Sequence, residues 1–167
     1  MDTGDDDVVI RITNKSNMYT SVNASVDTSV DASVDTTLQD YIKNKDYFQI
    51  YNIIKTRTIN KKINNYVYIV YSLLQLQMGN TSHALYIINN LKNNNTTPNN
   101  IHIIYKSYII ILKKMGKQQE AEELFEEYIK MNNSNYYYNL FNKILDDYVL
   151  IETEINNIFM ELIHYIK

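Results

Sequence analysis

The sequence predicts an all-α protein made of about three antiparallel helical hairpins, with a disordered N-terminal tail and a long C-terminal capping helix. Apolar residues recur three or four positions apart over most of the chain after residue 36, as in amphipathic helices. Three glycines and one proline in 167 residues give too few turn signals for a β-sandwich or a glycine-rich nucleotide fold. A helix-turn-helix pattern also returns at intervals of 34 and 37 residues, which is typical of stacked hairpins.

The N-terminal segment 1–36 is expected to be disordered. Residues 21–36 repeat a four-residue unit, SVNA SVDT SVDA SVDT, which contains no large side chain to bury. Such a segment cannot offset the conformational entropy that is lost on ordering. A tail without a specific role and a Ser/Thr phosphorylation switch beside Asp27, Asp31 and Asp35 are both compatible with this pattern.

The first hairpin is expected at about 38–56, at the start of a folded domain that covers 37–167. Thr37 and Asp40 have the spacing of a capping box, which satisfies free N–H groups at the start of a helix. Lys45 stands where the later hairpins have a turn glycine, so this copy is the least regular of the three.

The second and third hairpins, at about 62–93 and 98–131, carry the clearest repeat. A Met-Gly pair, followed five residues after the glycine by an alanine, occurs in both: Met78-Gly79 with Ala84, and Met115-Gly116 with Ala121. Glycine can take the left-handed conformation that ends a helix, and alanine lets the two helices of a hairpin cross closely. Thr97-Pro98 is expected to supply the cap and the first-turn proline of the third hairpin.

The stretches QMGNTSHALYIINNL and KMGKQQEAEELFEEYI resemble the tetratricopeptide repeat (TPR) family, whose hairpins stack into an α-solenoid. The resemblance implies a concave groove, formed by the first helix of each hairpin, that binds a helix or peptide of another protein. When the family's register is carried over position by position, the expected groove residues are Tyr66, Ile69, Val70, Leu73, Gln77, Ile103, Lys106, Ser107, Ile110, Lys113 and Lys114.

The C-terminal helical segment 135–167 contains no glycine or proline and has an apolar seam with heptad spacing. One interpretation is a cap of one or two helices lying against the last hairpin, since the end of a repeat array needs covering. The alternative is a self-associating helical bundle formed through the heptads. The seam residues are Phe141, Ile144, Tyr148, Ile151, Ile155, Ile158 and Leu162.

The expected function is that of a non-enzymatic adaptor or complex subunit that binds another protein. A groove this apolar fits a hydrophobic helix, either from a partner or from the chain's own C-terminal segment. A fainter resemblance, within residues 78–160, to the TPR-bearing subunit of the trafficking protein particle (TRAPP) complex suggests vesicle tethering. The alternative from another class is a pentatricopeptide-like RNA-binding protein, because residues 105–130 also fit that family's spacing.

No catalytic, cofactor or metal site is expected. The three histidines, His83, His102 and His164, are far apart in the sequence, and the chain has no cysteine. Formal charges of -5 over 1–37, +5 over 38–130 and -3 over 131–167 are too balanced for a nucleic-acid binder. The longest uncharged apolar stretch, 66–76, is shorter than the roughly 20 residues that span a bilayer, and the acidic start is no import signal. A cytoplasmic protein is therefore expected.

Overall fold

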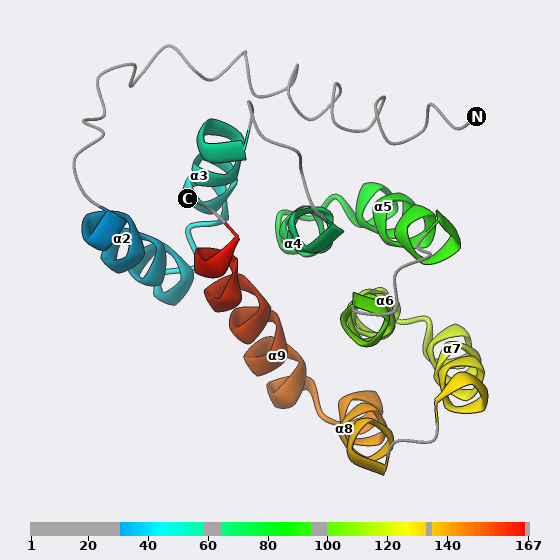
Figure 1. Ribbon diagram of the computed structural model, residues 1–167. Coiled ribbons are helices and arrows are strands. Elements are labelled where there is room, and N and C mark those ends of the chain that lie inside the picture. The colour runs from blue at the N-terminus through cyan, green and yellow to red at the C-terminus, as the bar shows by residue number, and fades with distance from the viewer. Residues whose placement is uncertain (1–30, 59–64, 95–99, 133–134, 166–167) are drawn as a thin grey trace.

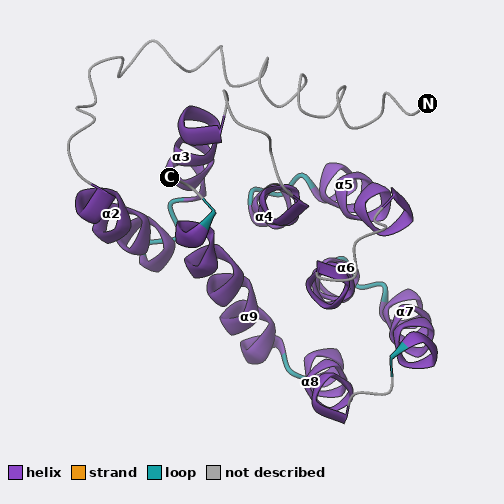
Figure 2. Cartoon of the chain, viewed as in Figure 1, coloured by secondary structure: helices purple, strands orange, loops and turns teal. Residues whose placement is uncertain are grey.

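The described part of the chain is entirely helical. The structure, a computed structural model, describes residues 31–58, 65–94, 100–132 and 135–165. Within these ranges there are eight α-helices and no strand (Figure 2), so the predicted all-α class is confirmed. The helices are α2 (Asp31–Lys43), α3 (Tyr47–Thr58), α4 (Asn65–Gln77), α5 (Thr81–Asn94), α6 (Ile101–Lys114), α7 (Gln118–Met131), α8 (Asn135–Asp146) and α9 (Tyr148–Glu161), followed by the 3-10 turn η2 (Leu162–His164).

The first three helix pairs reverse direction through the same backbone conformation. The second residue after each first helix has a left-handed backbone, with φ of 57° at Lys45, 88° at Gly79 and 75° at Gly116. In each turn the residue that follows bonds back to a carbonyl five positions earlier, for example Asn80 N–H to Gln75 O at 2.8 Å. This is the Schellman ending of a helix, which satisfies carbonyls that the helix leaves free. The prediction that the two glycines end helices is confirmed.

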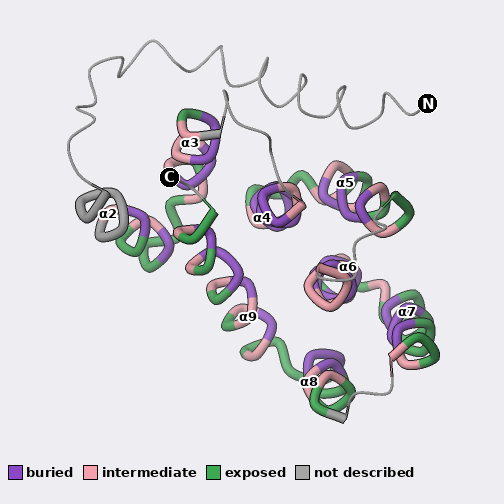
Figure 3. Tube along the Cα trace, viewed as in Figure 1, coloured by how far each residue is buried: buried purple, intermediate pink, exposed green. Residues whose placement is uncertain are grey.

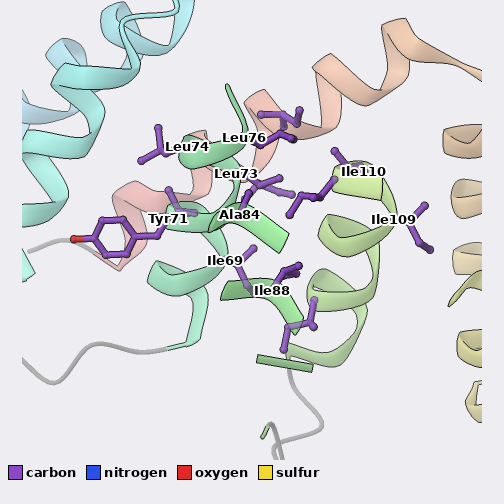
Figure 4. Close-up of a cluster of buried hydrophobic side chains, with 14 of the residues drawn as sticks. Ile69, Tyr71, Leu73, Leu74, Leu76, Ala84, Ile88, Ile109 and Ile110 are labelled. Atoms are coloured by element: carbon purple, nitrogen blue, oxygen red, sulfur yellow. The ribbon is translucent and has the colours of Figure 1, made fainter. Parts of the chain in front are cut away.

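The helix pairs pack on one another in chain order. α4 packs against α5, α5 against α6, and α6 against α7, so that each pair shares its core with the next. Figure 1 shows α4, α6 and α8 in one row, with α5 and α7 in a second row outside it. Ala84 and Ala121 are fully buried where the two helices of a pair meet. Figure 4 shows Ala84 among isoleucine and leucine side chains from the neighbouring helices.

The C-terminal segment is two helices, one of the two arrangements that the sequence left open, and not the single long capping helix. The break lies at Asp147, whose backbone is extended with φ -128° and ψ 103°. Its carboxylate accepts hydrogen bonds from Val149 N–H at 2.9 Å and Leu150 N–H at 3.2 Å. The aspartate carboxylate takes backbone N–H groups that would otherwise bond to carbonyls of the preceding helix, so α8 ends and α9 begins here.

The N-terminal boundaries also differ from the expectation. α2 begins at Asp31, inside the segment expected to be a disordered tail. Thr37 therefore lies within a helix, and the capping box predicted at Thr37 and Asp40 is wrong. The rest of the tail, residues 1–30, and the Thr97-Pro98 cap lie outside the described residues.

The buried side chains form one continuous core that runs through all eight helices. The burial pattern in Figure 3 shows the purple, buried stripes of the helices turned towards one another. None of the helices in the described ranges is long and apolar enough to cross a membrane.

Candidate partner groove

The inner row of helices has an open side, and α9 lies along it. After α8, the chain turns back at Asp147, and α9 crosses the inner side towards the first helix pair (Figure 1). α9 contacts α2 and α4, and η2 also packs on α4. We call the surface formed by α4 and α6 on this side the inner groove. The chain's own C-terminal helix therefore lies over the inner groove, where it packs on α4 and forms ion pairs with α6.

Two glutamates of α9 meet two lysines of α6. The Nζ atom of Lys114 is 2.5 Å from Glu152 Oε1, and that of Lys106 is 2.8 Å from Glu154 Oε2. The side chains of Lys106 and Glu154 are only 17% and 12% exposed, so this pair is largely removed from water. Pairs with such limited exposure are screened less by salt than surface pairs, and they fix the position of one helix on another.

Glu152 is held by a small polar cluster. Besides Lys114, it accepts a hydrogen bond from Gln77 Nε2 at 3.1 Å, and the same amide nitrogen donates to the hydroxyl of Tyr47 at 3.3 Å. Burial raises the pKa of the Glu152 carboxyl, but the bonds from Lys114 and Gln77 and the nearby charge of Lys45 outweigh it, so that the pKa is below its usual value. The carboxylate form is thus the one that the groove stabilises.

A second attachment point joins the start of α4 to the end of α9. The hydroxyl of Tyr66, a fully buried side chain, donates a hydrogen bond to the backbone carbonyl of Ile158. The ring of Tyr165 stacks on that of Tyr66, with centroids 4.2 Å apart. Burial is the largest cause that raises the pKa of Tyr66 above its usual value, and the charge of Glu161 adds to it. Tyr66 is therefore a neutral hydrogen-bond donor.

The structure divides the expected groove residues into two groups. Those that meet α9 directly are Tyr66, Gln77, Lys106 and Lys114, together with Lys113, whose ammonium lies 5.4 Å from the centre of the Tyr148 ring. Five others are fully buried like Tyr66, and in this conformation they offer no open surface: Ile69, Val70, Leu73, Ser107 and Ile110. The remaining one, Ile103, is half-buried.

The seam residues are mostly inside the chain. Phe141, Ile144, Ile151, Ile155, Ile158 and Leu162 have exposed fractions of 3% or less. Tyr148 is the exception, at 61% exposed, because it begins α9 directly after the break. The seam therefore faces this chain's own core, and in this conformation it offers no continuous apolar stripe to another molecule.

A cavity of about 220 Å³ remains between α6, α8 and α9. Its lining includes His102, Lys106, Tyr137 and Glu161. The His102 ring stacks on Tyr137 with centroids 4.0 Å apart, and its Nδ1 shares a hydrogen bond of 2.5 Å with the hydroxyl of Tyr128. Burial lowers the pKa of His102, so the neutral imidazole is favoured, and it raises the pKa of Tyr128 to about 12. The arrangement is that of a packed aromatic cluster.

The described residues contain no group of three or more histidine, aspartate or glutamate side chains placed to hold a metal ion. In comparisons with known proteins, no family model, no curated protein and no solved structure matches this chain. The class that the fold defines is an all-α protein of antiparallel helix pairs, with a C-terminal helix that packs on α2 and α4. The likeness to TPR proteins rests on the residues quoted above.

The two glutamates of α9 that contact the groove lysines were not predicted from the sequence. Glu152 and Glu154 lie outside the heptad seam, so a search for apolar periodicity passes over them. A signal was nevertheless present: α9 has two acids two residues apart, and the expected groove face of α6 has Lys106 and Lys114. Complementary charge between a groove and a terminal helix could have selected the chain's own segment as occupant.

Proposed function

We propose that this chain is a non-enzymatic interaction protein, an adaptor or complex subunit, whose inner groove binds an amphipathic helix of another protein. The proposal rests on one observation, namely that α9 lies over the inner groove. α9 is itself such a helix, held by buried isoleucines, two ion pairs and one tyrosine hydrogen bond. A groove that accepts a helix in cis has the shape and charge to accept a similar one in trans.

The contacts of α9 define the chemistry of the partner helix. Ile151, Ile155 and Ile158 are buried and follow the spacing of one helical face. Glu152 and Glu154 add two negative charges that meet Lys114 and Lys106. The expected partner segment is therefore an amphipathic helix with isoleucine-type residues at i, i+4 and i+7 and acids at i+1 and i+3. It competes with α9 for the same surface.

Competition with a tethered helix lowers the apparent affinity of any partner. A segment joined by a short link acts at an effective concentration of about a millimolar or above. A partner helix must bind the groove tightly enough to overcome this effective concentration, or the binding of α9 to the groove must first be weakened. The groove is thus closed to weak ligands and opens to a partner that binds the same lysines and apolar surface more tightly.

The groove lysines bear on the RNA-binding alternative. Lys106 and Lys114, the groove lysines that an RNA backbone would need, are paired with glutamates in the folded chain. This favours a protein partner over the pentatricopeptide alternative. A role in vesicle tethering and a cytoplasmic location are part of the proposal only through the sequence resemblance and the composition.

The test uses a fluorescent peptide with the sequence of residues 147–164 and three forms of the full-length chain. In E152K/E154K, α9 meets Lys106 and Lys114 with like charge, so it leaves the groove while the groove itself is intact. Fluorescence anisotropy should show tight peptide binding to this variant and weak binding to the wild type.

The matched control is K106E/K114E, which also repels its own α9 but offers the peptide the wrong charge. It should bind the native peptide no better than the wild type does. A peptide that carries the E152K and E154K changes should reverse this preference. If the native peptide bound all three chains equally, or none of them, the groove would not be a helix-binding site and the proposed function would fail.

A further inference from the structure

The heptad seam continues without interruption through the break between α8 and α9. Its residues are spaced alternately by three and four positions from Phe141 to Leu162, and the step from Ile144 to Tyr148 is a regular step of four. The segment 135–162 contains no glycine or proline. By sequence alone, α8 and α9 can form one helix of about 40 Å, at 1.5 Å per residue.

The local feature that favours the bent form is a helix cap. Asp147 caps α9 by accepting hydrogen bonds from Val149 N–H and Leu150 N–H. In a continuous helix the same N–H groups would bond to carbonyls four residues earlier, so they are satisfied in both forms. The rest of the bend is maintained at a distance, by the contacts of α9 with α2, α4 and the lysines of α6.

The bend also leaves its own apolar residues in solvent. Tyr148 and Val149 are 61% and 77% exposed, and they directly follow the cap. In a continuous helix Tyr148 would align with Ile144 and Ile151, both fully buried residues of the seam. The bent form therefore exposes Tyr148, whereas the straight form places it in line with the other residues of the apolar seam.

We infer that α9 is exchanged between two copies of this chain: α8 and α9 join into one helix at Asp147, and each α9 fills the inner groove of the other copy. The inference rests on the proposed function only in that α9 must leave the groove. A second copy is the occupant that fits best, because it supplies the same lysines, the same Tyr66 hydroxyl and the same apolar surface. The contacts of α9 with α2, α4 and the lysines of α6 are then remade in trans, while the backbone at Asp147 changes from bent to straight.

The first experiment compares the association of the full-length wild type, D147A and D147N by sedimentation equilibrium. Asparagine caps a helix about as well as aspartate, so D147N removes the charge but keeps the bend. Alanine removes the cap and favours a continuous helix. Together these two effects shift the equilibrium between the bent and the straight form about tenfold towards the straight form at each hinge. Because a dimer has two hinges, D147A should associate about a hundredfold more tightly than the wild type, and D147N should match the wild type.

The second experiment identifies exchange as the cause of association. K106E/K114E and E152K/E154K each place like charges between α9 and the groove of their own chain. When the two chains are mixed, an exchanged heterodimer pairs opposite charges at both grooves, whereas neither closed monomer does. Native mass spectrometry of the mixture should show a one-to-one complex in clear excess over either homodimer.

The inference would be overturned if D147A sedimented as a monomer like D147N, or if the mixed charge variants stayed separate. A D147A dimer without a heterodimer in the mixture would also overturn it, since association would then use another surface. If these results appeared while the α9 peptide still bound E152K/E154K, the groove would remain a helix-binding site and only the exchange between copies would be lost.

Discussion

Lys45 has a left-handed backbone at the turn of the first hairpin, where the other two hairpins have glycine. Its φ of 57° compares with 88° at Gly79 and 75° at Gly116, and the hydrogen bonds of the three turns are the same. For a residue with a Cβ atom this conformation costs about 1–2 kcal/mol, whereas glycine adopts it without that cost. Replacement of Lys45 by glycine should therefore stabilise the protein.

The net gain in stability is smaller than the conformational cost of the left-handed backbone that glycine removes. Glycine loses more conformational freedom on folding, which takes back roughly 0.5–1 kcal/mol. The substitution also removes a positive charge that acts on Glu152. Lys45→Ala loses the same charge but keeps the backbone cost, so the difference between the glycine and alanine variants isolates the conformation. We expect Lys45→Gly to exceed Lys45→Ala by about 1 kcal/mol in free energy of unfolding.

The assay is urea unfolding followed by circular dichroism, with thermal unfolding as a second measurement. About 1 kcal/mol corresponds to a rise of roughly 2–4 °C in Tm for a chain of this size. Gly79→Ala supplies the opposite test. A Cβ at Gly79 meets no atom within 4 Å, so any loss of stability there comes from the backbone. If Lys45→Gly were no more stable than Lys45→Ala while Gly79→Ala lost stability, the left-handed backbone at Lys45 would carry no conformational cost and the three turns would not be equivalent.

Three further predictions concern α9 and its groove. Tyr66→Phe should cost about 1 kcal/mol and should weaken the loss of stability above pH 10, because the raised pKa of Tyr66 means that folding favours its protonated form; urea titrations at pH 7 and 11 check this. Glu152→Gln should weaken the fall in the free energy of unfolding at acid pH, since a carboxyl whose pKa is lowered in the folded state stabilises the fold above about pH 4.5 and loses that contribution as the pH falls. An equal dependence of the free energy of unfolding on pH in variant and wild type would contradict this. Ile155→Ala should cost about 2–4 kcal/mol by leaving a cavity under α9, and hydrogen exchange should then be faster in α9 than in α7; uniform exchange would argue against a separately docked helix.

The hairpins could be predicted because their signals are local. The second pair begins at Asn65 and the third at Ile101, where the sequence suggested 62 and 98, and the third ends at Met131 as expected. Gly79 and Gly116 mark the reversals because only a glycine takes a left-handed backbone without strain. In the first copy Lys45 takes the same conformation, so the turn is specified by the flanking helices as well as by the residue.

The break at Asp147 and the start of α2 could not be predicted by the same means. Asp147 interrupts a heptad pattern that contains no glycine or proline, and a cap is recognised only once its carboxylate reaches the backbone N–H groups. Residues 31–36 lack large apolar side chains, so no periodicity indicated the helix that begins at Asp31.

The groove was predicted as a surface, but its occupant was left open between a partner and the chain's own C-terminal segment. That choice depends on a turn of the chain after α8 and on ion pairs such as Lys106 with Glu154, which are 48 residues apart in the sequence. Contacts of such separation have no local signature. They emerge only when the hairpins have stacked and the lysines of α6 face the inner side.

The bond from Tyr66 to Ile158 joins positions that are 92 residues apart, and α9 also touches α2. In an open row of hairpins each pair contacts only its neighbours, so the ends can fray while the centre stays folded. Here the helix that crosses the row connects its beginning with its end, so local melting at either end removes contacts at the other. As long as α9 stays docked, α2 to α8 should accordingly unfold in one cooperative transition, with the slowest-exchanging amides spread over several hairpins.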